Sequence, residues 1–227
     1  MPHQPLLLTG LSHEEQAELV AAAQPRLLTP REVLGHQGEP ADRFALVQIG
    51  YLKLGQVNPA GAESLVRFIG PVDCYGAVAI VPGKRFPVSA IAVEPSRVLI
   101  WVRPVITRFA DRLPRLKSNI FDEVTRRMAG VLSAAQDLAT ERVPQRLARA
   151  LLRVATHGGS PTTGGGLKIV HPLTRQELAD LTGATLFTVS RLMSSWETAG
   201  LLHTGRRTVT ILDPEGLELA ASSGEDA

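Results

Sequence analysis

Cysteine is nearly absent from this sequence of 227 residues, which contains only Cys74. A single cysteine excludes an intramolecular disulfide framework, a four-cysteine iron–sulfur cluster and a cysteine-based structural zinc site. Long apolar runs are missing too, although 44% of the residues are hydrophobic. No stretch reaches the roughly 18 apolar residues of a membrane-spanning helix, and the first residues, MPHQPLLLTG, lack the features of a secretory signal. We therefore expect a cytoplasmic protein without membrane contact.

The sequence also lacks the common motifs of catalytic sites. It contains no GxSxG elbow around a nucleophilic serine, no phosphate-binding P-loop, no HExxH zinc motif and no paired-carboxylate motif. His171 precedes Pro172, where we expect it to shape the entry to a domain rather than to perform chemistry. These absences predict a protein that is not an enzyme. Its length allows one large domain or two smaller ones.

Charge is nearly balanced over the whole chain but unevenly distributed. The formal net charge is +2. Residues 141–212 contain 9 basic and 4 acidic residues, whereas residues 213–227 contain 5 acidic and no basic residues. A local excess of positive charge is what contacts with nucleic-acid phosphates require. An ordinary solvated surface is the alternative explanation.

The most informative segment is LTRQELADLTGATLFTVSRLMSSWETAG, residues 173–200. Thr174 and Glu177 form a capping box, in which each side chain satisfies a free amide of the first helical turn. Gly183 ends this helix, because glycine readily adopts the left-handed conformation of a helix end. A second helix begins near Thr185 and has the apolar period of a half-buried helix. Its apolar residues are Val189, Leu192, Met193 and Trp196.

This period leaves one face of the second helix outside. The residues on that face are Thr185, Leu186, Phe187, Thr188, Ser190, Arg191 and Ser194. Two helices with this spacing are typical of a helix-turn-helix, whose second helix enters the major groove of DNA. Residues 201–202 and 208–212 are predicted strands that enclose HTGRR. This hairpin is a candidate wing, with Arg206 and Arg207 near the phosphate backbone.

Upstream of this segment the pattern changes twice. Ser12 and Glu15 form another capping box, which predicts a short helix over residues 14–23. Between residues 27 and 101, short β-type segments alternate with turn residues, which predicts a sandwich or small roll. These segments are 44–49, 51–57, 64–69, 88–93 and 97–101. Residues 144–155 are a predicted helix with a proline in its first turn, and the glycine-rich residues 157–166 are a predicted loop or tight connection.

A long helix is predicted over residues 116–140, with apolar residues spaced alternately three and four apart. They are Phe121, Val124, Met128, Val131, Ala135 and Leu138. This spacing is the a/d pattern of a seam between two helices. Four charged residues are expected to point outward and keep the apolar stripe narrow: Asp122, Glu123, Arg126 and Arg127. The pattern therefore favours a dimer interface over a helix that lies on its own domain.

These segments, in this order, resemble the cyclic-AMP receptor protein/fumarate-nitrate regulator (CRP/FNR) superfamily of bacterial transcription factors. The resemblance covers nearly the whole chain. It is most specific over TRQELADLTGATLFTVSRLMSSWETAGLL, and PVDCYGAVAIVPGKRFPVSAIAVEPSRVLIW falls in the expected place. It implies an α+β fold with an N-terminal double-stranded β-helix (a cyclic-nucleotide-binding-like jelly roll), a long dimerisation helix and a C-terminal winged helix-turn-helix. The expected domains are residues 1–113, 114–140 and 141–227.

The resemblance also implies partners and DNA contacts. Such proteins are homodimers that bind pseudo-palindromic double-stranded DNA, recruit or obstruct RNA polymerase, and respond to an effector in the roll. Ser190 and Arg191 match the pair of the oxygen-responsive branch in which arginine reads a guanine and serine touches a neighbouring base. Phe187 stands where relatives often carry glutamate, so it either packs on a thymine methyl group or belongs to the core. The matching phosphate-contact positions are Gln176, Thr185 and Thr188, with Arg206 and Arg207 from the wing.

The effector positions depart from those of cyclic-AMP-binding members. In those proteins a glutamate follows a glycine to hold the ribose, and an arginine precedes Ser/Thr-Ala to hold the cyclic phosphate. Here the candidate pocket consists of Gly76, Ala77, Val88, Ser89 and Ala90. Alanine and valine replace both charged residues, so the anion clamp is lost. We therefore expect an effector other than cyclic AMP, or none.

Haem is the remaining cofactor to consider. Carbon-monoxide-responsive relatives use a cysteine near the position of Cys74 and a histidine two residues later, where this chain has Gly76. We predict no cofactor, metal or iron–sulfur cluster, and Cys74 as a small buried hydrophobe. A thiol redox sensor would require a lowered pKa. Haem-based sensing of NO or CO is an alternative, and a small-molecule-binding roll without DNA function is a second one.

Overall fold

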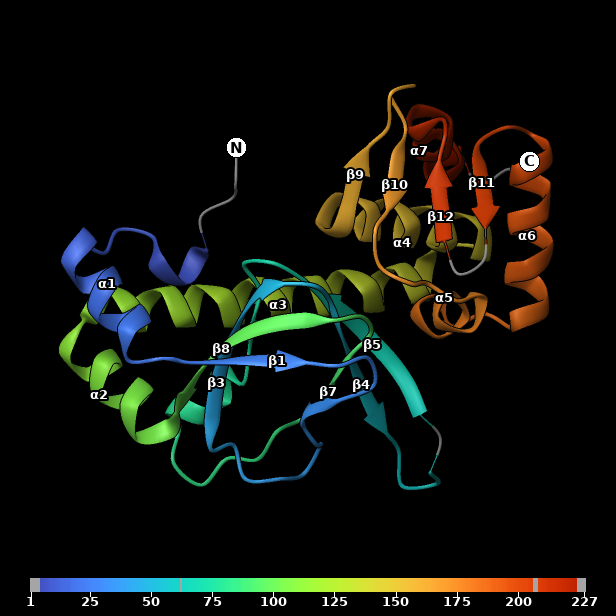
Figure 1. Cartoon of the computed structure of the whole chain (residues 1–227). Coiled ribbons are helices and arrows are strands. Elements are labelled where there is room, and N and C mark those ends of the chain that lie inside the picture. The colour runs from blue at the N-terminus through green and yellow to red at the C-terminus, as the bar shows by residue number, and fades with distance from the viewer. Residues whose placement is uncertain (1–4, 62, 206–207, 224–227) are drawn as a thin grey trace. The chain divides into compact units, whose positions relative to one another are not determined.

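The structure is a computed structural model that describes residues 5–61, 63–205 and 208–223. The chain divides into two compact units (Figure 1). The first consists of residues 1–63 and 67–131, and the second of residues 64–66 and 132–227. The boundary at residue 131 falls inside helix α3 (Pro114–Thr140), which belongs to both units.

Two four-stranded sheets make up the roll near the N-terminus, with the orders β1-β8-β3-β6 and β2-β7-β4-β5. The strands of the first sheet are β1 (Gln24–Leu28), β8 (Ser96–Val102), β3 (Arg43–Ile49) and β6 (Cys74–Tyr75). Those of the second are β2 (Val33–Gly35), β7 (Ser89–Ala92), β4 (Leu52–Val57) and β5 (Glu63–Ile69). Strands that are distant in sequence thus become neighbours, as in a jelly roll.

Side chains from the two sheets meet in an apolar interior. Tyr75 and Phe86 stack inside it with ring centroids 4.8 Å apart, and both are buried. The Tyr75 hydroxyl donates a hydrogen bond to the Val88 carbonyl at 3.0 Å, so its polar end is satisfied within the core. This interior is the first of two cores in the roll.

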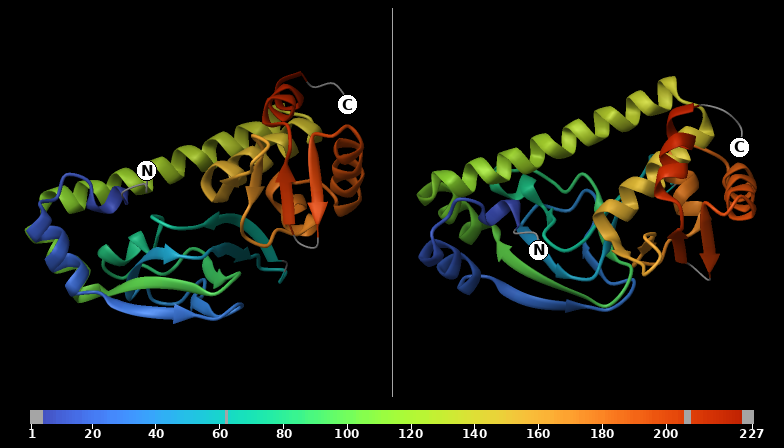
Figure 2. Two further views of the ribbon diagram at one scale, coloured as in Figure 1. Left: turned by 45° about the horizontal axis from the view of Figure 1, so that its top comes forward. Right: turned by 90° about the horizontal axis from the view of Figure 1, so that it is seen from above.

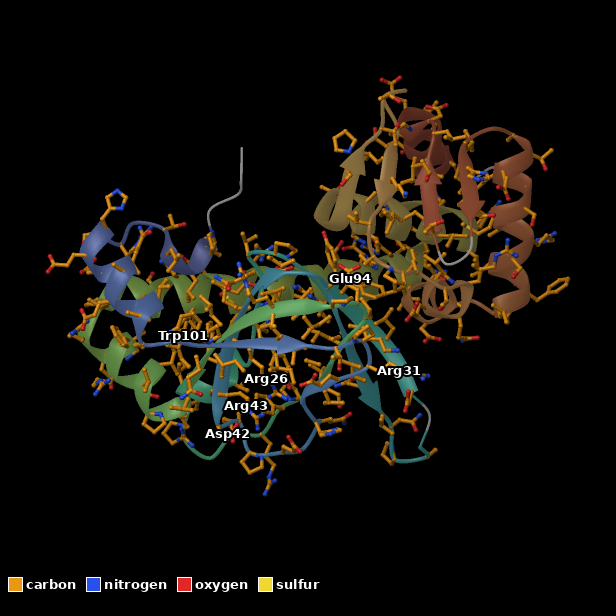
Figure 3. The ribbon with its side chains drawn as sticks, in the orientation of Figure 1. Arg26, Arg31, Asp42, Arg43, Glu94 and Trp101 are labelled. Carbon is orange, nitrogen blue, oxygen red and sulfur yellow. The ribbon has the colours of Figure 1, made fainter. Side chains whose placement is uncertain are left out.

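The second core lies on the other face of the first sheet, under helices. These are α1 (His13–Ala21), α2 (Arg103–Arg112) and the beginning of α3. Trp101 of β8 is buried there, and its indole N–H donates to the Leu19 carbonyl of α1 at 2.7 Å (Figure 3). The predicted capping box of α1, Ser12 with Glu15, is confirmed. Short 3-10 turns cover Leu6–Leu8 (η1) and Ala77–Ile80 (η2).

Helix α3 is one unbroken helix of 27 residues (Figure 2). Helix α2 had no counterpart in the sequence analysis. It begins directly after β8, with Pro104 in its first turn, so no turn residue separates strand from helix. Among the described residues, no helix has the length and apolar character needed to cross a membrane.

The second unit combines helices with a small sheet of order β11-β12-β10-β9. Its helices are α4 (Val143–Gly158), α5 (Arg175–Thr182), α6 (Leu186–Thr198) and α7 (Pro214–Ser223). Its strands are β9 (Gly159–Pro161), β10 (Leu167–Ile169), β11 (Leu202–Gly205) and β12 (Thr208–Ile211). The α+β fold with roll, long helix and winged helix-turn-helix is confirmed. The loop predicted over residues 157–166 is wrong in part, because α4 reaches Gly158 and β9 pairs with β10.

Candidate functional site

Helices α5 and α6 form the predicted helix-turn-helix. The Thr174 hydroxyl accepts the Glu177 amide at 3.2 Å, and the Glu177 carboxylate accepts the Thr174 amide at 2.9 Å. Gly183 ends α5 in the left-handed region, with φ of 61°. Thr185 caps α6 by accepting the Thr188 amide at 3.1 Å. The sequence therefore fixes both ends of the turn through local hydrogen bonds.

The inner face of α6 is apolar and buried, as the period predicts. Val189, Leu192, Met193 and Trp196 are all buried. The outer face begins at the capping residue and continues through Phe187, Arg191 and Ser194, which are exposed. Because a recognition helix must present side chains beyond its own domain, this division suits contact with base edges.

The predicted base-contact residues lie along this outer face. Phe187 is 77% exposed, so the alternative that it belongs to the core is wrong. Arg191 is exposed, and within the described ranges it has no hydrogen-bond or ion-pair partner. Ser190 is half-buried on the same helix. An unpaired guanidinium next to a serine leaves its donors available to an external acceptor.

Two of the predicted phosphate-contact residues lie at the start of the same helix. Thr185 and Thr188 share a hydrogen bond between their hydroxyls at 2.9 Å. Gln176 is exposed on α5 and donates to Asp180 at 2.9 Å. Arg206 and Arg207 lie outside the described residues. Thr185 and Thr188 thus lie at the N-terminal end of α6, and Gln176 lies at the N-terminal end of α5.

The long helix α3 exposes most of the residues predicted for the dimer seam. Phe121 is 69% exposed and Met128 61%, and Val131, Ala135 and Leu138 are exposed as well. Val124 differs, because it is half-buried and packs against the helix-covered core of the roll. Leu132 is another exposed apolar residue of α3 that the heptad pattern did not select.

The charged residues of α3 do not all point outward, which corrects the sequence analysis. Glu123 is only 5% exposed and forms ion pairs with Arg126 and Arg127 at 2.5 and 2.6 Å. Arg127 also donates to the Cys74 carbonyl of β6, and Arg126 lies 3.6 Å from buried Asp73. Burial opposes the charge of Glu123, but the two guanidinium groups outweigh it and lower its pKa. Helix α3 is thus fastened to the roll by charge on the side away from its exposed apolar residues.

The candidate effector positions are tightly packed. Gly76 has φ of 78°, and a Cβ atom there would lie 2.4 Å from the Arg43 carbonyl oxygen. Ala77 and Ala90 are buried, and the Ser89 hydroxyl accepts the Gln37 amide at 2.9 Å.

Val88 is half-buried against the apolar interior. Arg85 is the arginine nearest in sequence before Val88, the position where cyclic-AMP-binding members carry an arginine. It is exposed and donates to the Gly38 carbonyl at 2.7 Å, so its guanidinium is engaged outside that interior. The five candidate positions themselves carry no charged side chain.

Cys74 is 2% exposed, and burial raises the pKa of its thiol to about 12. It lines a cavity of about 10 Å³, enough for about one water molecule. Asn119 lines the same cavity, and its buried Oδ1 accepts no hydrogen bond from the described part of the chain. Within the described ranges, no group of three or more His, Cys, Asp and Glu side chains is arranged to hold a metal ion.

Comparisons with known proteins agree with this arrangement. Two family models match: the cyclic nucleotide-binding domain over residues 25–112 and the Crp-like helix-turn-helix domain over residues 145–220. The CRP-like cAMP-activated global transcriptional regulator of Mycobacterium tuberculosis is 29% identical, over 93% of this chain and 94% of that protein. The cyclic AMP receptor protein of Thermus thermophilus is 26% identical over the same shares. The solved structure of FixK2 from Bradyrhizobium japonicum has a TM-score of 0.77 at 20% identity, covering 89% of this chain and 99% of that one.

Proposed function

Because the chain belongs to the CRP/FNR family of transcription regulators, we propose that it is a homodimer that binds inverted-repeat DNA through α6. The family consists of transcription regulators rather than enzymes. The observation that carries the proposal is the outer face of α6, where Phe187 and Arg191 are exposed above a buried apolar face. In this proposal Arg191 reads a guanine through O6 and N7, Ser190 touches a neighbouring base, and Phe187 packs on a thymine methyl group.

Phosphate contacts complete the DNA surface in this proposal. Gln176, Thr185 and Thr188 hold the backbone beside the recognition helix, and Arg206 and Arg207 do so from the wing. The basic excess of residues 141–212 supports these roles. RNA polymerase, which the bound dimer recruits or obstructs, is the further partner, and the cytoplasm is the compartment.

Dimerisation through α3 is supported by its exposed apolar residues, since large apolar side chains in a row are unfavourable in water. We expect the double variant Met128→Asp, Val131→Asp to be monomeric and to bind the operator poorly. Light scattering measures the mass directly. An unchanged dimer mass would reject this seam.

The effector of the roll, in this proposal, is not cyclic AMP. Ala77 and Val88 supply no charge where cyclic-AMP-binding members carry glutamate and arginine, and stacked Tyr75 and Phe86 occupy the interior. Titration calorimetry with cyclic AMP should give no heat of binding, and operator affinity should not change. A saturable heat at one site per subunit would overturn this part.

A haem-based gas sensor remains the alternative for the signal. An absorption spectrum after haem supplementation tests this alternative, because a Soret band would favour haem.

The second alternative, a ligand-binding roll without DNA function, is tested by sequence selection from random DNA. The proposed regulator should enrich an inverted repeat whose half-site centres are one helical turn, about 34–36 Å, apart. Recovery of unrelated sequences would favour the second alternative.

A further inference from the structure

The recognition helix holds the neighbouring strand through one carboxylate near its end. Glu197 of α6 accepts the backbone amide of Thr204 at 2.8 Å and the Thr204 hydroxyl at 2.7 Å. His203 Nδ1 lies 3.0 Å from the same carboxylate. Both partners belong to β11, which lies beside α6 in Figure 1. One side chain of α6 therefore makes three polar contacts to the wing, the β11–β12 hairpin.

The position of this carboxylate is unfavourable for the helix itself. Glu197 is in the last turn of α6, where the helix dipole disfavours negative charge. Strand β11 is at the edge of its sheet, so one side of its backbone has no neighbouring strand in the described part of the chain. Glu197 satisfies the Thr204 amide on that open side. The hydrogen bonds from Thr204 lower the pKa of Glu197, so the carboxylate is charged at neutral pH.

The chain between α6 and the wing fixes the base of the hairpin. The Leu201 amide donates to the Trp196 carbonyl at 2.9 Å, and Gly200 has φ of 76°. Thr204 is three residues further along β11, directly before its last residue, Gly205. Glu197 thus holds the part of the strand that lies nearer the turn of the hairpin.

We propose that Glu197 is a positioning residue that locks the wing to the recognition helix, so that both contact one DNA half-site as a unit. The inference rests on the proposed DNA binding. Arg206 and Arg207 follow β11 directly in the sequence, and in the proposed function they contact phosphate from the wing. Glu197 itself touches no base in this proposal. It acts through the strand that it holds.

If Glu197 positions the wing, removing its charge should change DNA affinity in the direction opposite to that expected from charge alone. Removing a carboxylate from a DNA-binding surface should strengthen DNA binding, because less negative charge faces the phosphates. If Glu197 positions the wing, the uncharged variant Glu197→Gln should instead bind more weakly. The exposed acid Glu218 of α7 provides the matched control for charge alone, as Glu218→Gln.

The test measures operator affinity of the full-length protein at several salt concentrations. Glu197→Gln and Thr204→Val should each lose about 3- to 10-fold in operator affinity. The slope of log affinity against log salt concentration should become less steep, by the amount that about 1–2 phosphate contacts contribute. Relative preference for each base pair should not change. Thr204→Ser, which keeps the hydroxyl, should restore wild-type binding, and Thr210→Val on β12 serves as the matched control within the wing.

Hydrogen exchange of the Thr204 amide provides an independent measurement without DNA. This amide should be protected from exchange in the wild type and should exchange quickly in Glu197→Gln. Equal or tighter operator binding by both variants, or an unchanged salt slope, would overturn the proposal. If Glu197→Gln does not fold, Thr204→Val decides. If the wild type selects no operator, the proposed function fails, and amide exchange still decides whether Glu197 holds the wing.

Discussion

Polar side chains differ between two regions of the molecule. At the junction of the roll and α3 they are buried and paired, whereas on the outer face of α6 they are exposed. At the junction, Glu123 is turned inward and bound to two arginines, and the Asn119 amide donates to the carbonyls of Leu7 and Thr9 at 3.0 and 2.8 Å. On α6, Arg191 is turned outward with no partner in the described ranges. Leaving a buried polar group unpaired costs free energy, whereas exposed groups are available to other molecules. The first region holds the fold together, and the second is left open for recognition.

The strongest test of this contrast is removal of the buried carboxylate. Glu123→Gln leaves Arg127 without its anionic partner in a largely buried site, which should cost about 3 kcal/mol. Urea unfolding followed by Trp101 fluorescence in a Trp196→Phe background measures the roll. Asp122→Asn, one residue away and exposed, is the control and should change stability by less than about 0.5 kcal/mol. Equal effects of the two variants would contradict a fixing role for Glu123.

Two neighbours on α6 sharpen the comparison within a single helix. Val189→Ala should destabilise the second unit by about 2 kcal/mol because it leaves a cavity in the core. Phe187→Ala should change stability by less than about 0.5 kcal/mol, since the ring is exposed. It should alter the preferred operator sequence instead. Thermal unfolding and DNA selection on both variants check this, and a large loss of stability in Phe187→Ala would contradict it.

A smaller, pH-dependent effect is expected from His171, which is buried in the second unit. Burial lowers its pKa below the usual 6.5, although the Pro172 carbonyl and Glu177 oppose the shift. Below pH 6.5 the unfolded chain binds a proton that the folded chain does not. The unfolding free energy should therefore fall with decreasing pH, by at most about 1.4 kcal/mol per pH unit. Trp196 fluorescence measures this unfolding free energy. The His171→Gln variant should lose its dependence on pH, and the His203→Gln control should retain it.

The smallest effect is expected at Cys74. A buried thiol with a pKa of about 12 is almost entirely protonated at pH 8, so it should not react with a disulfide reagent in the folded protein. Ala60→Cys, in the exposed turn between β4 and β5, should react quickly under the same conditions. Both thiols should react after unfolding in urea. Rapid reaction of native Cys74 would revive the redox-sensor interpretation.

Much of the DNA-binding unit could be predicted from sequence because its signals are local. The capping box at Thr174, the left-handed Gly183 and the period of α6 each need only neighbouring residues. Helix α7 had no such signal. Because the segment after residue 212 is acidic, its buried apolar residues, Leu217 and Ala220, were not assigned to a helix.

The direction of Glu123 could not be predicted because its environment comes from a distant strand. Arg127 points inward to reach the Cys74 carbonyl, 53 residues earlier in the chain. Within the heptad pattern a charged residue beside the seam indicates solvent, and only the folded roll reverses that interpretation. The same reasoning applies to Val124, which the pattern assigned to the seam and the roll core partly buries.

The most direct test of the central claim is a base-resolved affinity map of the selected operator with the wild type and with Arg191→Ala. If the outer face of α6 reads bases, the variant should lose about 1–3 kcal/mol on the operator and become indifferent to the identity of one base pair per half-site. Equal weakening at every base pair, with all preferences retained, would show that Arg191 contacts only phosphate and would contradict the account.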